Sequence, residues 1–335
     1  MADDPLTYRH GGDYVVTEDI EDIYSSRWDS VLDPFSEEDM KTFIHHLLKR
    51  APRTEKELNA ASNEVRRQLK IAPRRSQLLH ALQRFGGAEG AADVSGADAY
   101  DVDGPEVAGG GDGSGGEPEP SPYQRLSKLL VKKASKSQSG VLVITVLTSP
   151  YPVVDGKKQK FSCAWNCYYC PNEPGQPRSY LHDEPAVKRA NENGFDAVLQ
   201  FTDRGATLAM NGHPVDKIEL LVLGGTWTSY PLEYREEFVR DLFYAANTFG
   251  SRHAHRRQER YSLAVEQKIN ESAACKIIGL TLETRPDTID AEEVRRLRSY
   301  GCTRVQLGVQ HTDDAVLRKI NRGCYTEDTI SALRQ

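Results

Sequence analysis

The chain has 335 residues, of which 38% are hydrophobic, enough for about two domains with a packed core. No apolar run approaches the roughly eighteen residues of a membrane span, and the acidic first residues resemble neither a signal peptide nor an Arg-rich transit peptide. Six cysteines without an export signal favour a reducing compartment, so we expect a cytoplasmic protein with no membrane association.

The net charge of −6 is unevenly distributed along the chain. Residues 1–40 carry twelve acidic and two basic side chains, and residues 86–121 carry nine acidic and no basic ones, so the rest of the chain carries +13. The overall charge therefore conceals basic segments that could bind a polyanion such as nucleic acid.

Residues 1–35 lack a sustained periodicity and are predicted to form an acidic flexible tail. Residues 36–85 are predicted to form a basic helical region with three helices. The first begins after Ser36 as an N-cap, the second after Thr54 in a capping box with Glu57, and the third covers about 76–85. From residue 49 to residue 85 there are ten basic and three acidic side chains, which favours binding to RNA phosphates over a merely solvated face.

Residues 86–121 contain eleven glycines and no periodic apolar face. Such a segment cannot bury enough surface to become ordered, so we interpret it as a disordered linker rich in Gly, Asp and Glu. A second basic stretch follows at 123–140, at the start of the predicted domain 122–335.

Residues 122–335 alternate between strand and helix patterns, which predicts an α/β domain with a parallel sheet, either an open doubly wound sheet or a barrel. Because the strand patterns are continuously apolar, we expect strands that are buried on both faces. The predicted strands are 141–148, 217–225, 276–284 and 303–310. The predicted helices lie near 185–209, 231–248, 257–273 and 289–300, with two more after the last strand.

Three cysteines, Cys163, Cys167 and Cys170, lie in the run FSCAWNCYYCPNEPG, about fifteen residues after the first predicted strand. The CxxxCxxC spacing suits a 4Fe–4S cluster held by three thiolates, with one iron open to chelate S-adenosylmethionine. A zinc site would need a fourth ligand, for which His182 is the one nearby candidate, without the usual paired spacing. A disulfide is less favoured because no secretory context exists.

Four strings in order then resemble the catalytic subunit of Elongator: the cysteine loop, HPVDKIELLVLGGTWTSYPLEYREEFVRDLFYAAN, GLTLETRPD and YGCTRVQLGVQHTDDAVLRKINRG. The resemblance covers about residues 54–335. It implies a partial radical-SAM (β/α) barrel behind a basic N-terminal helical domain that holds tRNA. It also implies a transferase that uses a 4Fe–4S cluster, S-adenosylmethionine and acetyl-CoA to form 5-carboxymethyluridine at the tRNA wobble position (U34), with Elongator-like partner subunits.

The resemblance also implies roles for individual residues. The three cysteines would be the cluster ligands, and Lys217 would contact acetyl-CoA. The tRNA would lie on the basic helices, where we assign Arg66, Arg67, Arg74 and Arg75. The residues expected around the cofactor are Tyr169, Gly224, Gly225, Thr226, Glu283, Arg285, Gln306 and Gln310.

Two features depart from the family pattern. Relatives in animals and fungi usually have nine residues between the first two cysteines, whereas this chain has three, and the sequence stops inside a helical pattern. We therefore expect a C-terminally truncated form without the acetyltransferase domain. The alternatives are a non-catalytic tRNA-binding or assembly subunit and a radical-SAM enzyme with another substrate.

Overall fold

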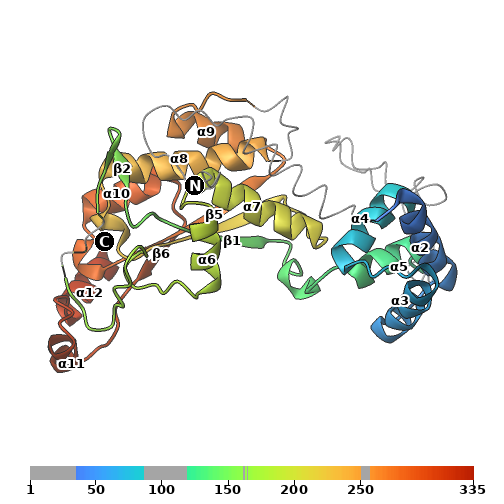
Figure 1. Cartoon of the computed structure of the whole chain (residues 1–335). Coiled ribbons are helices and arrows are strands. Elements are labelled where there is room, and N and C mark those ends of the chain that lie inside the picture. The colour runs from blue at the N-terminus through green and yellow to red at the C-terminus, as the bar shows by residue number, and fades with distance from the viewer. Residues whose placement is uncertain (1–34, 87–118, 161–162, 164, 250–256) are drawn as a thin grey trace, which may run out of the picture. The chain divides into compact units, whose positions relative to one another are not determined.

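The computed structural model describes residues 35–86, 119–160, 163, 165–249 and 257–335 (Figure 1). The predicted tail 1–35 and the predicted linker 86–121 lie almost entirely outside these residues. The described residues form two compact units, a helical one before residue 135 that also includes residues 210–213, and a sheet-containing one. In neither described unit is there a helix long and apolar enough to cross a membrane.

The helical unit begins as its capping residues predict. The Ser36 hydroxyl accepts from the backbone N–H of Asp39 at 3.1 Å, and the Thr54 hydroxyl accepts from that of Glu57 at 3.2 Å. Each bond satisfies a backbone donor that has no partner inside its helix, so both predicted helix starts are confirmed. The four helices are α2 (Glu37–Arg50), α3 (Glu55–Leu69), α4 (Arg75–Phe85) and α5 (Pro122–Leu130).

Helix α5 belongs to the helical unit and not to the sheet unit. Its residues Leu126 and Leu130 are fully buried in the same apolar cluster as Phe43 of α2 and Leu82 of α4. The predicted domain boundary at residue 122 was therefore too early. The basic residues of this stretch do not indicate which core the helix joins. Its leucines, which lie one turn apart and are buried on one face, decide this.

The second unit is built on a parallel sheet of β1 (Leu142–Leu147), β4 (Lys217–Leu223), β5 (Lys276–Thr284) and β6 (Arg304–Leu307). The strands lie in the order β1-β4-β5-β6, the order in which they follow one another along the chain. A doubly wound sheet would reverse its strand order at a switch point, whereas a barrel keeps it. The α/β prediction is confirmed as a partial barrel whose described strands do not close.

Helices connect the strands and pack beside the sheet (Figure 1). A short hairpin of β2 (Val153–Val154) and β3 (Lys157–Lys158) precedes the cysteine loop. The helices between β1 and β4 are α6 (Pro185–Glu192) and α7 (Ala197–Met210), and those between β4 and β5 are α8 (Leu232–Thr248) and α9 (Leu263–Asn270). Helix α10 (Ala291–Ser299) precedes β6, and α11 (Asp314–Lys319) and α12 (Thr326–Arg334) follow it.

The main core of this unit lies on one face of the sheet. Alternate residues of β1 and β4, such as Ile144 and Leu220, are fully buried against the helices. On the opposite face Val143 and Ile278 are about half exposed, and β6 is mostly exposed. The prediction of strands buried on both faces was therefore wrong, because strand apolarity does not reveal whether an element covers the second face.

Candidate active site

The parallel strands β4, β5 and β6 end beside one cavity. The cavity walls come from the cysteine loop after β1, the residues after β4, the end of β5, the residues after β6 and the segment between α11 and α12. Parallel strands bring their carboxyl ends to the same edge, which is where barrel enzymes place their chemistry. The lining includes Cys163, Cys167, Cys170, Gly225, Thr226, Glu283, Arg285, Gln310 and Arg322.

All three cysteines of the motif line this cavity, and each sulfur has polar neighbours. The Cys163 sulfur lies 3.7 Å from the Thr226 hydroxyl, and the Ser179 hydroxyl donates to the Cys170 sulfur at 3.0 Å. Cys163 and Cys170 are half-buried, whereas Cys167 is only 3% exposed. One short loop thus brings all three cysteine side chains to the wall of one cavity.

The Cys167 sulfur lies between two arginines. The guanidinium groups of Arg285 and Arg322 each donate to it at 3.7 Å. The thiol also lies 3.7 Å from the backbone carbonyl of Arg322. Two cationic side chains and one backbone carbonyl thus surround this sulfur at the wall of the cavity.

The turn after β4 allows close approach to the cavity because its first two residues are glycines. Gly224 has φ +135° and Gly225 has φ +100°, backbone conformations that favour glycine. A Cβ on Gly224 would lie 1.8 Å from the Thr148 hydroxyl oxygen. Gly225 and Thr226 line the cavity, so bare backbone and one hydroxyl face the space beside the cysteines.

Glu283 is the one carboxylate among the described residues that line the cavity, and a tyrosine is hydrogen-bonded to it. The Tyr180 hydroxyl donates to Glu283 Oε2 at 2.8 Å. Burial raises the pKa of Glu283 above its ordinary value, although the Tyr180 hydrogen bond and the charge of Arg322 act in the opposite direction. Burial, and then the nearby Glu283, raise the pKa of Tyr180, so this hydroxyl remains a donor.

These residues fit a cluster with three cysteine ligands better than a zinc ion. Among the described residues the cavity lining holds three cysteines and no histidine. The backbone N–H of His182 is bonded to the Glu173 carboxylate at 2.8 Å, and neither residue lines the cavity. Within the described ranges no group of three His, Cys, Asp or Glu side chains is arranged so that it could hold a metal ion. Three cysteine side chains around one cavity match the protein ligands of a 4Fe–4S cluster that keeps one iron free.

Other predicted residues lie elsewhere or at the rim. Lys217 is exposed at the start of β4 and lies 3.9 Å from the Asp216 carboxylate. Six further residues of β4, at about 3.3 Å each, separate it from the end of the strand beside the cavity. Gln306 and Tyr169 are exposed and do not line the cavity, whereas Gln310 does, with φ +70°.

The lining residues Arg178, Ser179 and Arg322 were not predicted from the sequence, whereas Trp165 and Trp227 were both candidates for stacking a splayed uridine. Ser179 and Arg178 follow the cysteine motif in the chain, and a rule that searched for polar residues beside the motif would have found them. Arg322 follows β6 by fifteen residues, so no rule about strand ends selects it. Trp165 also lines the cavity, with the Arg285 guanidinium 5.7 Å from its ring centre, whereas Trp227 is buried in the core.

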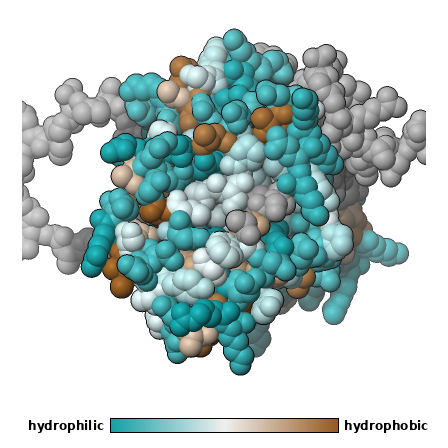
Figure 2. All heavy atoms as spheres, turned by 90° about the vertical axis from the view of Figure 1, so that its left-hand side faces the viewer, coloured by the Kyte–Doolittle hydropathy of each residue, from teal (hydrophilic) through white to brown (hydrophobic). Residues whose placement is uncertain are grey.

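The face of the sheet unit that carries α11 and α12 is mainly hydrophilic (Figure 2). Apolar side chains appear there as small separate patches and not as one continuous area. This suits a polar substrate better than a large apolar partner.

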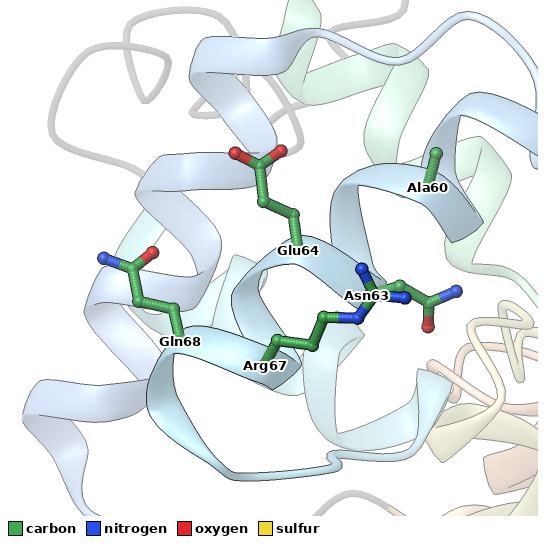
Figure 3. A pocket seen from close by; sticks show the side chains of 5 residues that line it. All are labelled: Ala60, Asn63, Glu64, Arg67 and Gln68. Carbon is green, nitrogen blue, oxygen red and sulfur yellow. The ribbon is translucent and has the colours of Figure 1, made fainter.

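The predicted tRNA-binding arginines of the helical unit differ in their exposure and in their partners within the protein. Arg66 donates to the carbonyl of Pro73 at 3.2 Å, and Arg75 pairs with Glu55 at 3.0 Å. Arg67 and Arg74 are exposed. Five side chains of α3, one of them Arg67, line an open hollow on one side of this helix (Figure 3). They are Ala60, Asn63, Glu64, Arg67 and Gln68.

Comparison with known proteins supports the interpretation of the cysteine cavity as a radical SAM site. The family model described as "Radical SAM superfamily" matches residues 161–335. A tRNA uridine(34) acetyltransferase from Dehalococcoides mccartyi is 35% identical over 60% of this chain and 40% of its own length. One from Methanocaldococcus infernus is 37% identical over 62% of this chain and 36% of its own.

Elongator complex protein 3 from Homo sapiens is 35% identical over 61% of this chain and 36% of its own length. The resemblance inferred from the four strings is thereby confirmed. The chain spans less than half the length of these curated relatives. The family model covers just over half of the chain and includes the cysteine loop, the strands β4, β5 and β6, and Arg322. The chain therefore belongs to the radical SAM superfamily.

Proposed function

We propose that this chain is the radical SAM part of an enzyme that modifies uridine 34 of tRNA. The proposal is supported by the relatives named tRNA uridine(34) acetyltransferase and by the cavity that the three cysteines line. The finer proposal is that acetyl-CoA supplies the carbon atoms for 5-carboxymethyluridine. The role of Lys217 in contacting acetyl-CoA remains part of this proposal, at a distance from the cysteine cavity.

The single observation that carries the proposal is the convergence of three thiols beside a glycine turn. Cys163, Cys167 and Cys170 would hold a 4Fe–4S cluster, and Gly225 and Thr226 would face the amino group of S-adenosylmethionine. When bound, these two cofactors supply a radical that abstracts hydrogen.

The residues of this chain would bind the cofactors, orient them and shield them from water. Cys167 is nearly excluded from water, and Trp165 lies over the segment that carries Arg322, so solvent reaches this sulfur poorly. Glu283, fixed by Tyr180, presents an oriented acceptor beside the cysteines. Such fixed groups cost no reorganisation when a ligand arrives.

The helical unit would supply the electrostatic part of tRNA binding. The exposed charges of Arg67 and Arg74 suit phosphate contacts, because the neighbouring Glu64 is already paired with Arg50 at 2.6 Å. Relatives named Elongator complex protein 3 are by name members of a complex, so we include partner subunits in the proposal. The expected location remains the cytoplasm, where the six free thiols would stay reduced.

The test of the enzyme is anaerobic reconstitution with iron and sulfide. We expect about four irons per chain, and formation of 5′-deoxyadenosine from S-adenosylmethionine when tRNA and acetyl-CoA are present. The triple variant C163A/C167A/C170A should lose both. The control C302A removes a cysteine outside the cavity and should keep both. A chain that binds iron but never forms 5′-deoxyadenosine would favour the non-catalytic alternative.

The test of the tRNA surface is charge reversal. The variant R67E/R74E should bind tRNA more weakly and with a flatter dependence on salt, by roughly 0.7–0.9 in log–log slope for each phosphate that is no longer neutralised. The control R298E reverses an exposed charge in the sheet unit. Equal affinity of R67E/R74E and the wild type would remove the helical unit from tRNA recognition.

A further inference from the structure

Two arginines contact the same buried sulfur, but their charges are balanced differently. Arg285 and Arg322 are 3% and 6% exposed, and both donate to Cys167. Arg285 also forms two bonds with the Asp287 carboxylate, at 2.8 and 2.9 Å. The positive charge of Arg285 is therefore compensated by a carboxylate of the protein.

Among the described residues Arg322 forms no such ion pair with a carboxylate, although its charge acts on the nearby Glu283. One of its terminal nitrogens bonds to the carbonyl of Gly308, and its Nε is buried without a hydrogen-bond partner. The Glu283 carboxylate, which accepts from the Tyr180 hydroxyl, forms no salt bridge with this guanidinium within the described part of the chain. A buried charge without a counterion is costly, so a group of opposite charge is expected beside it.

The fold fixes Arg322 in this position. Its backbone N–H donates to the carbonyl of Leu317 at 2.9 Å, and its carbonyl accepts from Arg285 at 3.0 Å. The next residue, Gly323, has φ +59°, and a Cβ there would lie 2.3 Å from the Trp165 ring. The segment is thus held beneath Trp165, and the guanidinium cannot move far from the cysteine.

We propose that Arg322 is a positioning residue whose charge, which no salt bridge within the described residues neutralises, acts through Cys167 on the iron–sulfur cluster. This inference rests on the proposed cluster site. A 4Fe–4S cluster held by three thiolates has a formal charge of minus one when oxidised and minus two when reduced. A fixed positive charge against one ligand therefore stabilises the reduced form more than the oxidised form.

The redox step consists of one electron, which a low-potential one-electron reductant such as dithionite donates and the cluster accepts. No bond forms or breaks. Removing a unit charge at this distance, in a partly screened interior, should lower the equilibrium constant for reduction about tenfold. For one electron this corresponds to about 59 mV in the midpoint potential.

The experiment compares the reconstituted wild type with R322Q, R322K and R318Q. Arg318 is exposed and lies one turn earlier in the chain, so R318Q removes the same charge without contact with the cysteine. Iron and sulfide content, thermal unfolding and the midpoint potential are measured on each. We expect the potential of R322Q to fall by the amount above, that of R322K to recover most of it, and that of R318Q to equal the wild type.

The outcomes separate the inference from the proposed function. If the wild type takes up its cluster and R322Q has the same potential, the inference is refuted while the proposed site stands. If the wild type takes up no cluster, the proposed site itself fails. If R322Q and R322K both lose the cluster, guanidinium shape and not charge is required, and the inference is again refuted.

A second variant covers the case in which R322Q does not fold. Citrulline at position 322 keeps the shape of arginine without its charge. It can be installed by ligating a synthetic peptide of residues 302–335, which begins with Cys302, to a thioester of residues 1–301. A folded citrulline protein with the wild-type potential would refute the role of the charge, and a lowered potential would support it.

Discussion

Replacement of Gly224 by alanine is expected to destabilise the sheet unit and open the cavity. Gly224 follows β4 directly and has φ +135°. Its Cβ would lie 1.8 Å from the Thr148 hydroxyl oxygen and 3.1 Å from the Thr148 backbone nitrogen. No rotamer of alanine relieves these contacts, because Cβ is fixed by the backbone. The end of β1 or the glycine turn must therefore move.

The cost can be worked out from two contributions. The positive φ costs a residue with a side chain about 1–2 kcal/mol. The displaced Thr148 hydroxyl lies 2.9 Å from the Tyr230 hydroxyl and 3.2 Å from the Leu223 carbonyl, and a buried polar group that loses its partner costs about 1–3 kcal/mol. Together we expect G224A to lower the free energy of unfolding by about 2–5 kcal/mol.

The assay is urea unfolding followed by far-UV circular dichroism, with G140A as the matched control. Gly140 also has a positive φ, +75°, but a Cβ there would have no atom within 4 Å. The control therefore isolates the backbone contribution, about 1–2 kcal/mol. If G224A and G140A are destabilised equally, steric contact with Thr148 does not hold this turn, and the reasoning is refuted. Iron content after reconstitution should fall in G224A alone.

Two further predictions concern other buried positions. Burial would raise the pKa of Glu266, but hydrogen bonds from Arg257, the Tyr261 backbone and other donors outweigh it and lower that pKa. Glu266 therefore stabilises the fold above the ordinary carboxyl pKa of 4.5 and loses this effect as the pH falls through its lowered value. E266Q should lower the free energy of unfolding by about 2 kcal/mol at pH 7. Urea unfolding at several pH values should show a weaker loss of stability toward acid pH in E266Q than in the wild type, and an equal loss would contradict this. G323A should displace the Trp165 ring and lower cluster retention, measured as iron per chain, and retention equal to the wild type would show that the ring tolerates the methyl group.

Local features of the structure were predictable from short stretches of sequence. The N-caps Ser36 and Thr54 and the order of strands and helices follow from patterns that extend over a few residues. The convergence of Cys163, Cys167 and Cys170 was predictable for the same reason, since one loop carries all three. The turn at Gly224 was located, but the reason for its glycine, the hydroxyl of Thr148, became visible only across the sheet.

The sequence by itself determined the type and order of the elements, the helix starts and the composition of the cysteine loop, because these depend on residues that are neighbours in the chain. Only the tertiary structure decided that α5 joins the helical core, that one face of the sheet stays partly exposed, and that Arg322 contacts Cys167 across 155 residues of sequence. Likewise, Tyr180 reaches Glu283 across 103 residues. Such contacts depend on the packing of all four strand ends at one edge, and no periodicity in the sequence encodes which side chains meet there.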